Sequence, residues 1–231
     1  MPVISFANPK GGTGKSTSAL ILALQLAERG GQVALVDCDP NQVTAGWAKS
    51  RSDMGLECPF EAICNPKEDE IIDVLDDLAQ RYAFVIVDLE GTASLMMSRT
   101  MSRSHLTVIP MQPSPVDAKQ AARAVQLIRA EEKTLRRDIP MRILMTRNNP
   151  AIKTRDERAI TEQLQSANVP ILEEPLHERA AFRALFSFSK TLTELTVAES
   201  AGLPNARKNA ENYAYHVIAA LKSELAGAQA A

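Results

Sequence analysis

Short apolar runs alternate with longer amphipathic stretches along this chain, and the alternation predicts helices between buried strands. The apolar runs are rich in Val, Ile and Leu, which is typical of strands buried on both faces of a sheet. Strands that alternate with helices imply right-handed crossovers and a parallel sheet. We therefore expect an α/β fold with helices on both faces of a mostly parallel, twisted sheet. The predicted strands are 3–7, 32–37, 84–88, 106–110, 142–146 and 170–172, and the predicted helices are 16–29, 68–79, 116–131, 156–167 and 207–225.

The sequence shows no internal repeat, no low-complexity linker and no second-domain boundary. We expect one domain over residues 1–225 and a frayed tail over residues 226–231. The chain also looks helical between its last predicted strand and its last predicted helix. Phe182, Phe186 and Phe188 recur there at near-helical spacing, so we expect them in the core.

Composition narrows the class of protein. The chain has 231 residues, of which 45% are hydrophobic and 23% charged, and this excludes a disordered chain. No apolar run approaches a bilayer span, and the first residues do not resemble a secretory leader, so we expect a cytoplasmic protein without membrane attachment. The net charge of −2 means that any nucleic-acid binding must come from a local basic patch. Three cysteines without a CxxC pair suit a reducing compartment.

A glycine-rich segment lies between the first predicted strand and the first predicted helix. The strict pattern G-x-x-x-x-G-K-[ST] fails, because Pro9 stands where its first glycine would be. The physical requirements of a phosphate-binding loop are still met, since glycines let backbone N–H groups converge on an anion and the following helix adds its dipole. Lys15 is expected near the β and γ phosphates, Ser16 on Mg²⁺ and Thr17 near the α-phosphate. The sequence thus predicts a P-loop NTPase that binds ATP and Mg²⁺ through Lys10, Gly11, Gly12, Thr13, Gly14, Lys15, Ser16 and Thr17.

Three aspartates follow two of the predicted strands. Asp37 and Asp39 end the second strand, and Asp88 ends the strand at 84–88. Ligands in parallel α/β sheets sit at the carboxyl ends of the strands. Asp88 is expected to hold Mg²⁺ through water, as a Walker B aspartate does. The alternative for each aspartate is a turn or helix cap.

The whole segment Lys10 to Thr17 resembles the signature of the deviant Walker A family, which includes ParA-type partition ATPases, MinD and the nitrogenase iron protein. The resemblance implies that Lys10 reaches the nucleotide of a partner subunit, and that two chains close as a homodimer around Mg·ATP. Asp37-Cys38-Asp39-Pro40-Asn41 is similar to the D-x-D-P-Q element of this family. By that likeness Asp39 orients or activates the attacking water, and Asp37 binds the metal shell or positions the loop. Glu90 departs from the family, which often has proline there.

Other segments separate the relatives. Asn148, with Arg147 next, falls in a segment similar to the adenine-contacting part of the family. Pro175-Leu176-His177-Glu178-Arg179 resembles small ParA partition ATPases and VirC1-like proteins of conjugative DNA transfer. The cysteines do not match the Fe–S ligands of the nitrogenase iron protein, and the sequence after Leu221 lacks the basic membrane helix of MinD. The position of the loop near residue 10 resembles ParA proteins without an operator-binding domain.

The resemblance also implies partners. We expect nonspecific DNA binding by the ATP-bound dimer, association with the nucleoid, and slow hydrolysis that a ParB-like or ribbon-helix-helix centromere-binding protein stimulates. Such binding needs surface cations within reach of phosphates. The alternatives are a VirC1-like DNA-transfer factor and an ATPase that positions a protein cargo. The candidate DNA-binding residues are Arg183, Lys190, Arg207 and Lys208.

Overall fold

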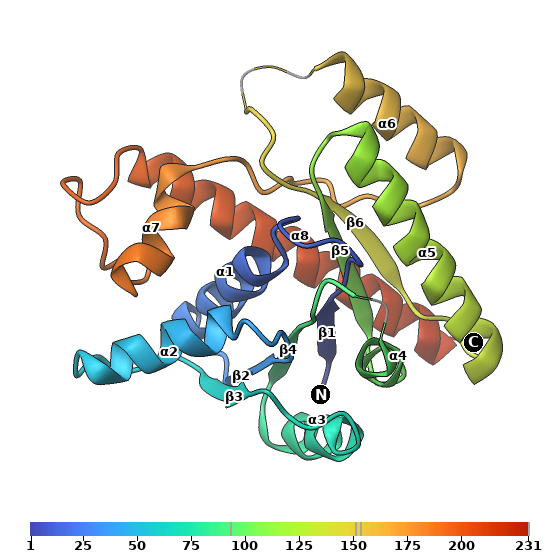
Figure 1. The fold of residues 1–231 in the computed structure, drawn as a ribbon, viewed down its shortest axis with the longest axis horizontal. Helices are drawn as coiled ribbons and strands as arrows, with labels where there is room; N and C mark the ends of the chain where they lie inside the picture. The colour runs from blue at the N-terminus through green and yellow to red at the C-terminus, as the bar shows by residue number, and fades with distance from the viewer. Residues whose placement is uncertain (93, 151, 153, 231) are drawn as a thin grey trace.

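A parallel sheet of six strands forms the centre of the part of the chain that the structure describes, residues 1–92, 94–150, 152 and 154–230 (Figure 1). This structure is a computed structural model. The strands lie in the order β3-β2-β4-β1-β5-β6, and every neighbouring pair is parallel. The strands are β1 (Val3–Phe6), β2 (Val33–Asp37), β3 (Glu61–Cys64), β4 (Phe84–Asp88), β5 (Leu106–Met111) and β6 (Met141–Met145).

Helices cover both faces of the sheet (Figure 1). Two separate apolar clusters result, one between the sheet and α1, α2, α7 and α8, and one between the sheet and α3 to α6. The predicted α/β class is therefore confirmed. The helices are α1 (Lys15–Glu28), α2 (Val43–Asp53), α3 (Ile71–Arg81), α4 (Leu95–Met101), α5 (Pro115–Leu135), α6 (Arg155–Ser166), α7 (Ala180–Phe188) and α8 (Leu203–Ala230).

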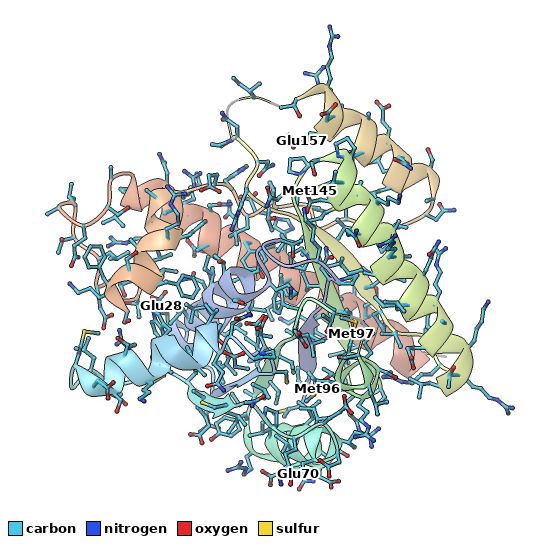
Figure 2. All side chains as sticks on the ribbon, viewed as in Figure 1. Glu28, Glu70, Met96, Met97, Met145 and Glu157 are labelled. Atoms are coloured by element: carbon cyan, nitrogen blue, oxygen red, sulfur yellow. The ribbon has the colours of Figure 1, made fainter. Side chains whose placement is uncertain are left out.

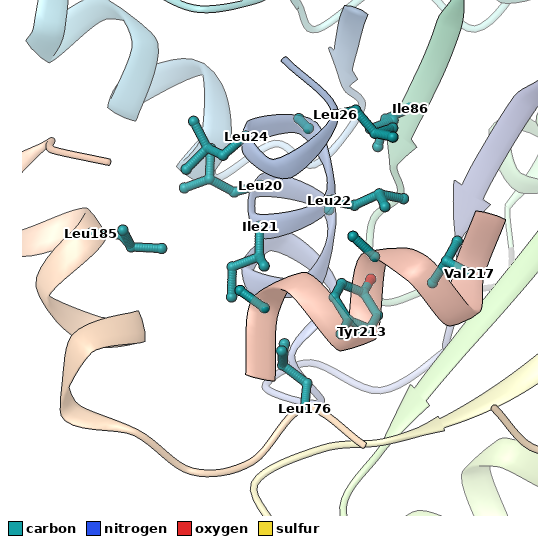
Figure 3. Close-up of a cluster of buried hydrophobic side chains, with 14 of the residues drawn as sticks. Leu20, Ile21, Leu22, Leu24, Leu26, Ile86, Leu176, Leu185, Tyr213 and Val217 are labelled. Carbon is teal, nitrogen blue, oxygen red and sulfur yellow. The ribbon is translucent and has the colours of Figure 1, made fainter. Parts of the chain in front are cut away.

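Helix α1 is enclosed between the sheet and α8 (Figure 3). Its residues Leu20 and Leu22 are fully buried, as is Tyr213 of α8. The Tyr213 hydroxyl donates a hydrogen bond of 3.1 Å to the carbonyl of Ser18. Because α1 begins directly after the glycine-rich loop, this packing fixes the position of the loop relative to the sheet.

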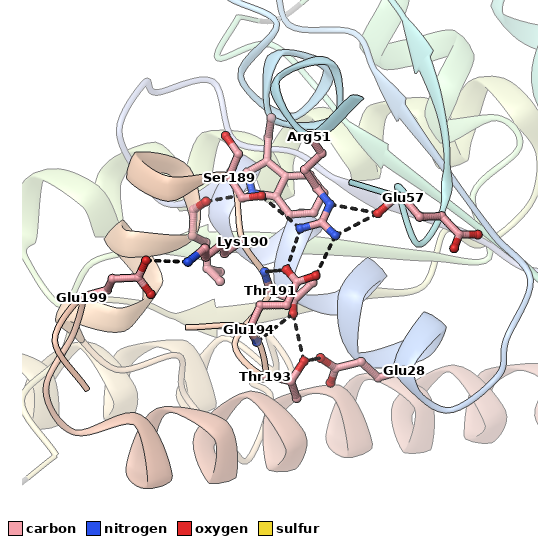
Figure 4. A network of polar contacts seen from close by, with 11 residues as sticks. Glu28, Arg51, Glu57, Ser189, Lys190, Thr191, Thr193, Glu194 and Glu199 are labelled. Carbon is pink, nitrogen blue, oxygen red and sulfur yellow. Dashed lines mark hydrogen bonds and ion pairs between the residues drawn. The ribbon is translucent and has the colours of Figure 1, made fainter. Parts of the chain in front are cut away.

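Helix α2 is held from its far end by Arg51, whose side chain is buried (Figure 4). The guanidinium donates to both carboxylate oxygens of Glu194, at 2.6 and 2.9 Å, and to the carbonyls of Glu57 and Ser189. Its hydrogen bonds lower the pKa of Glu194 to about 2. The Arg51 guanidinium also lies 5.1 Å from the centre of the Trp47 ring. This network connects α2 to the loop between α7 and α8.

The helices and strands that the sequence predicts occur within a few residues of their expected bounds, with one exception. Residues 170–172 do not form a strand, because only Ile171 makes a single bridge, to Ile143. The sequence missed β3, α2 and α4. Strand β3 lies at the edge of the sheet and is partly exposed, so its sequence lacks a continuous apolar run.

The segment before the last helix also differs from the prediction. Residues 189–202 are loop and turns rather than helix. Phe182 is in the core, and Phe186 packs partly against it. The expected burial of Phe188 is wrong, because the side chain lies at the last turn of α7 and is 40% exposed. Helix α8 continues to Ala230, and fraying of residues 226–231 stays a prediction. None of the described helices is both long enough and apolar enough to span a bilayer.

Candidate nucleotide site

The glycine-rich loop connects β1 to α1 and is shaped by two glycines with positive φ. Gly12 has φ 77° and Gly14, the last residue before α1, has φ 100°. Side chains rarely adopt this left-handed backbone, which explains glycine at both positions. Thr146, just after β6, supports the loop by donating a hydrogen bond of 2.8 Å from its hydroxyl to the carbonyl of Thr13. The N–H groups that begin α1 are therefore presented at the carboxyl edge of the sheet, where an anion binds favourably.

Lys15 crosses this loop from the first residue of α1. Its ammonium donates to the carbonyl of Lys10 at 3.2 Å, and the residue is only 5% exposed. Burial lowers the pKa of Lys15, and the carboxylates of Asp88, Asp39 and Glu90 partly offset this effect. A buried ammonium close to the N–H groups that begin α1 is suited to a multiply charged phosphate.

Lys10 makes a different contact, within its own chain. Its ammonium lies 2.9 and 3.0 Å from the two carboxylate oxygens of Asp117, whose side chain is 5% exposed. Ser114 donates its hydroxyl to the same carboxylate at 2.5 Å and also caps α5 by accepting from the Asp117 N–H. In this structure Lys10 is therefore bonded at the start of α5. Its contact with a partner's nucleotide stays a prediction.

The register of the sheet brings two of the predicted aspartates together. Strands β2 and β4 are neighbours, and Asp37 pairs with Asp88 at their carboxyl ends. Asp88 is fully buried, and neither of its carboxylate oxygens has a hydrogen-bond partner. Burial raises the pKa of Asp88 to about 7, partly opposed by the nearby Ser16 hydroxyl and Lys15. A buried carboxylate without a hydrogen-bond partner is suited to bind a cation.

These residues fit Mg²⁺ bound together with a nucleotide. The described residues contain no group of three or more His, Cys, Asp or Glu side chains that could hold a metal ion by themselves. Mg²⁺ is usually bound by one or two protein oxygens, with phosphate and water oxygens as its other ligands. Asp88 and the Ser16 hydroxyl at the start of α1 are suited to that role.

Asp37 and Asp39 have distinct surroundings. One carboxylate oxygen of Asp37 accepts from the backbone N–H groups of Thr44 and Ala45 and from the Thr44 hydroxyl, at 2.8 to 3.0 Å. Asp37 thus caps the first turn of α2, which is the alternative role given above, and its roles in the metal shell and in positioning the loop stay predictions. Asp39 is partly exposed and one of its oxygens accepts from the N–H and the side-chain amide of Asn41. Asn41 thereby orients Asp39 beside the loop.

Gly91 is a site residue whose role the sequence analysis missed. A Cβ atom there would lie 2.9 Å from the backbone nitrogen of Gly11 and 3.0 Å from the carbonyl carbon of Lys10. Backbone after β4 thus packs directly on the phosphate loop, and no side chain fits between them. The available signal was a glycine three residues after Asp88, the last residue of β4, but a single glycine is common in turns.

The predicted base contact, Asn148, is buried behind the site. Its amide donates to Glu157 at 3.2 Å, and its carbonyl oxygen lies 2.9 Å from Nδ1 of His177. Figure 2 shows Glu157 on α6, above the end of β6. Arg147 and His177 instead line a cavity of about 170 Å³ that also reaches Thr17. A direct contact between Asn148 and adenine stays a prediction.

The four candidate DNA-binding residues are mostly engaged within the chain. Arg183 pairs with Glu178, and Lys190 pairs with Glu199 at 2.5 Å. Arg207 donates to the carbonyl of Leu192 at 2.9 Å. Lys208 is exposed on α8 and, among the described residues, has no ion pair. Their binding to DNA stays a prediction.

Comparison with known proteins adds the family to this geometry. The sequence model of the VirC1 protein family matches residues 1–223. The chain is 37% identical to "Protein ParA" of Rhizobium radiobacter over 227 residues, which cover 97% of this chain and all of that protein. It is 27% identical to "Protein virC1" of Rhizobium rhizogenes over 191 residues, 80% of each chain. The fold is that of Cyanothece McdA, solved as a complex with ATP, with a TM-score of 0.74 at 15% identity over 94% of this chain and 96% of the other.

The match to the VirC1 model covers nearly the whole chain, and the ParA relative is aligned over its full length. The phosphate loop with its additional Lys10 lies within the matched region. The chain therefore belongs to the VirC1 family, among the ParA/MinD-type deviant Walker A ATPases.

Proposed function

We propose that this chain is a ParA-type ATPase that closes a homodimer around Mg·ATP and binds DNA nonspecifically, in order to segregate or position plasmid or chromosomal DNA. One observation carries the proposal. The loop that presents Lys15 lies beside Asp88, a buried carboxylate with no hydrogen-bond partner. Cation, backbone donors and carboxylate together are suited to a magnesium-bound triphosphate.

Each residue then has a role in hydrolysis of ATP to ADP and phosphate. Lys15 and the loop N–H groups would hold the β and γ phosphates, while Ser16 and Asp88 would hold Mg²⁺, which would neutralise phosphate charge. Asp39 orients a water that attacks the γ-phosphorus as the bond to the β–γ bridging oxygen breaks. Lys10 of the opposite subunit stabilises the charge that develops on the transferred group.

The edge of the sheet that carries this site also exposes apolar side chains, which favours a dimer face there. Val43, Leu95 and Val116 are 41%, 51% and 63% exposed. Each lies in the first turn of a helix that follows a strand end, in α2, α4 and α5 respectively. Apolar groups around a charged centre are typical of surfaces that become buried on association. A dimer closed over the nucleotide would cover them.

The cellular setting follows from the relatives. A protein named ParA aligns with the full chain, which supports DNA partition as the biological role. We infer that the ATP-bound dimer associates with the nucleoid in the cytoplasm, that hydrolysis is slow in isolation, and that a ParB-like or ribbon-helix-helix centromere-binding protein accelerates it. The match to the VirC1 model supports a second candidate, a conjugative DNA-transfer factor. A third, an ATPase that positions a protein cargo, needs no DNA binding.

Binding to random-sequence duplex DNA tests these alternatives. We expect binding with Mg·ATP, little binding with ADP, and affinity that falls steeply as salt rises. The molecular mass measured in the same buffers should double with ATP. A chain that hydrolyses ATP and dimerises, yet does not bind DNA at moderate salt, would be a protein-cargo ATPase. A chain that neither binds ATP nor dimerises would contradict the proposal as a whole.

A further inference from the structure

The solvent face of α5 is cationic along its length. The helix crosses one side of the sheet between α4 and α6 (Figure 1). It buries five residues against the sheet, Asp117, Ala121, Ala124, Val125 and Ile128. With 3.6 residues per turn, the opposite face is the one that presents four exposed cations, Lys119, Arg123, Arg129 and Lys133.

Acidic side chains are absent from this face. Glu131 and Glu132 lie more than about 100° around the helix from Lys119, toward its buried side. Glu132 is also engaged, since it accepts from the backbone N–H of Ile139 at 3.0 Å. Asp156 of α6 lines a groove together with Lys119 but forms no ion pair with it. The cationic face is therefore not neutralised by its own helix.

The four cations of this face also have no carboxylate partner among the described residues. Among the described residues, none of the four makes an ion pair, and the only side-chain hydrogen bond is from Arg123 to Gln120 at 3.3 Å. Arg183 and Lys190 differ, because each already has a carboxylate partner. A cation without a carboxylate partner can neutralise a phosphate, and so release the counterion condensed there, without first losing a protein contact. This property separates the α5 face from those two residues.

The spacing and the intervening residues indicate what kind of polyanion fits. From Lys119 to Lys133 the face extends about 21 Å at 1.5 Å per residue, far enough to follow several phosphates of one duplex. The exposed residues between the cations are Ala122, Gln126 and Ala130. Small side chains allow close approach of a sugar–phosphate backbone. The face lacks the large aromatic or aliphatic anchors that dominate protein interfaces.

We propose that the α5 face, defined by Lys119, Arg123, Arg129 and Lys133, binds the phosphate backbone of duplex DNA without reading its sequence. The proposal rests on the DNA-binding function proposed above and assigns the surface that performs it. Phosphate contacts of this type position a protein on DNA but carry no base specificity.

A pair of matched variants tests this assignment. The first replaces Lys119, Arg123 and Lys133 with Gln, a good helix former. The control replaces Lys49, Lys67 and Lys222 with Gln, which are also exposed and lie outside α5. Both variants lose three positive charges, so a general effect of net charge would be the same in each.

Fluorescence anisotropy with a random-sequence duplex, in Mg·ATP and over a series of salt concentrations, gives the readout. The α5 variant should bind at least about 10-fold more weakly, and the dependence of log affinity on log salt should become shallower by about one per lost phosphate contact. The control should keep wild-type affinity. ATP-dependent dimer mass, measured for all three proteins, shows that nucleotide binding and closure are intact.

Other outcomes overturn the assignment. Equal losses in both variants would point to net charge, and a loss in the control alone would place the DNA surface outside α5. Polyglutamate is a second probe: binding that the α5 variant loses while its DNA binding is unchanged would assign the face to an acidic protein. If wild-type protein closes a dimer with ATP but does not bind DNA at low salt, the proposed DNA-binding function fails, and this inference fails with it.

Discussion

At the scale of a single residue, protonation of Asp88 affects the stability of the ligand-free protein. Its carboxyl has a pKa of about 7 because it is buried without a hydrogen-bond partner, and Asp37 lies opposite it in the sheet. The unfolded chain releases this proton near pH 4, so between about pH 4 and 7 the folded state holds the extra proton. The sign of the effect follows: stability of the ligand-free protein falls as pH rises through this window.

Replacing Asp88 with Asn should therefore stabilise the ligand-free protein at neutral pH. Near pH 4 the two proteins should be similar, and the advantage of Asn should grow toward pH 7 and then level off, reaching on the order of 2 to 4 kcal/mol. Urea denaturation in EDTA at pH 4.5, 6 and 8 measures this. The same variant should lose the added stability that Mg·ATP gives the wild type. A stability difference that does not change with pH would contradict the argument.

The two lysines of the loop should have separable effects. Lys15→Ala should abolish ATP binding, because it removes the buried cation of the phosphate loop. Lys10→Ala should keep some ATP binding and lose dimer closure or hydrolysis, since the Lys10 ammonium points away from the loop and bonds to Asp117. Calorimetry with a nonhydrolysable ATP analogue measures the first effect, and phosphate release the second. Normal hydrolysis by Lys10→Ala would rule out a role for this lysine in catalysis.

At the scale of elements, α2 connects the catalytic loop to a distant segment. Its first turn is capped by Asp37, and its far end is bonded through Arg51 to Glu194. Arg51 is 3% exposed, so the Glu194 carboxylate is needed to compensate its buried positive charge. Through these contacts α2 connects the segment that carries Asp37 and Asp39 to the loop between α7 and α8.

Glu194→Gln should destabilise the protein at pH 7 by about 1 to 3 kcal/mol, because it leaves a buried guanidinium without its counterion. Glu194 is 38% exposed, and solvent screening places the effect at the lower end. Since bonding to Arg51 lowers the pKa of Glu194 to about 2, the wild-type advantage is present above about pH 4.5 and disappears as pH falls toward 2. Denaturant titrations at pH 7, 4 and 3 check the trend, with Glu199→Gln as a control on the same loop.

Elements with strong periodic patterns could be predicted from the sequence, and elements fixed by tertiary contacts could not. The buried strands β1, β2, β4 and β5 are continuous apolar runs and were found with small errors in their ends. Helix α2 has no clear apolar stripe, because its stability comes from Asp37 at one end and Arg51 at the other.

The candidate site shows the same division. The phosphate loop has a local signature, so its residues were predicted as a group. The bonding of Lys10 to Asp117 joins residues 107 positions apart, and no local pattern in the sequence reports it. Likewise, the surroundings of Asn148 depend on Glu157 of α6 and on His177 before α7, which is 29 positions away in the sequence.

At the scale of the whole molecule, the central question is whether the site is completed by a second copy. Mixing two inactive variants answers it. Lys10→Ala retains Asp39 in its own site, and Asp39→Ala retains Lys10. If Lys10 acts on the opposite subunit, a mixed dimer contains one complete site, and random pairing at equal concentrations should restore about a quarter of wild-type hydrolysis.

Phosphate release from the mixture, compared with each variant alone, is the measurement. A Lys15→Ala protein mixed with Asp39→Ala serves as a control, because no site in that pair has both an intact Lys15 and an intact Asp39. Recovery that is absent from the first mixture, although mixed dimers form by mass, would place Lys10 in its own subunit's site.

In a single copy of the chain, the Lys10 ammonium binds the Asp117 carboxylate, which also accepts a hydrogen bond from the Ser114 hydroxyl. Moving that ammonium away would leave the buried Asp117 carboxylate without its cation. Two copies without nucleotide would therefore lose an ion pair on closing, which disfavours the dimer. A triphosphate bound in the opposite subunit would offer the ammonium a stronger attraction. Because the dimer would be symmetric, Lys10 would exchange Asp117 for phosphate in both subunits. We therefore expect two copies to close as a dimer when both hold ATP, and to remain separate when only one does.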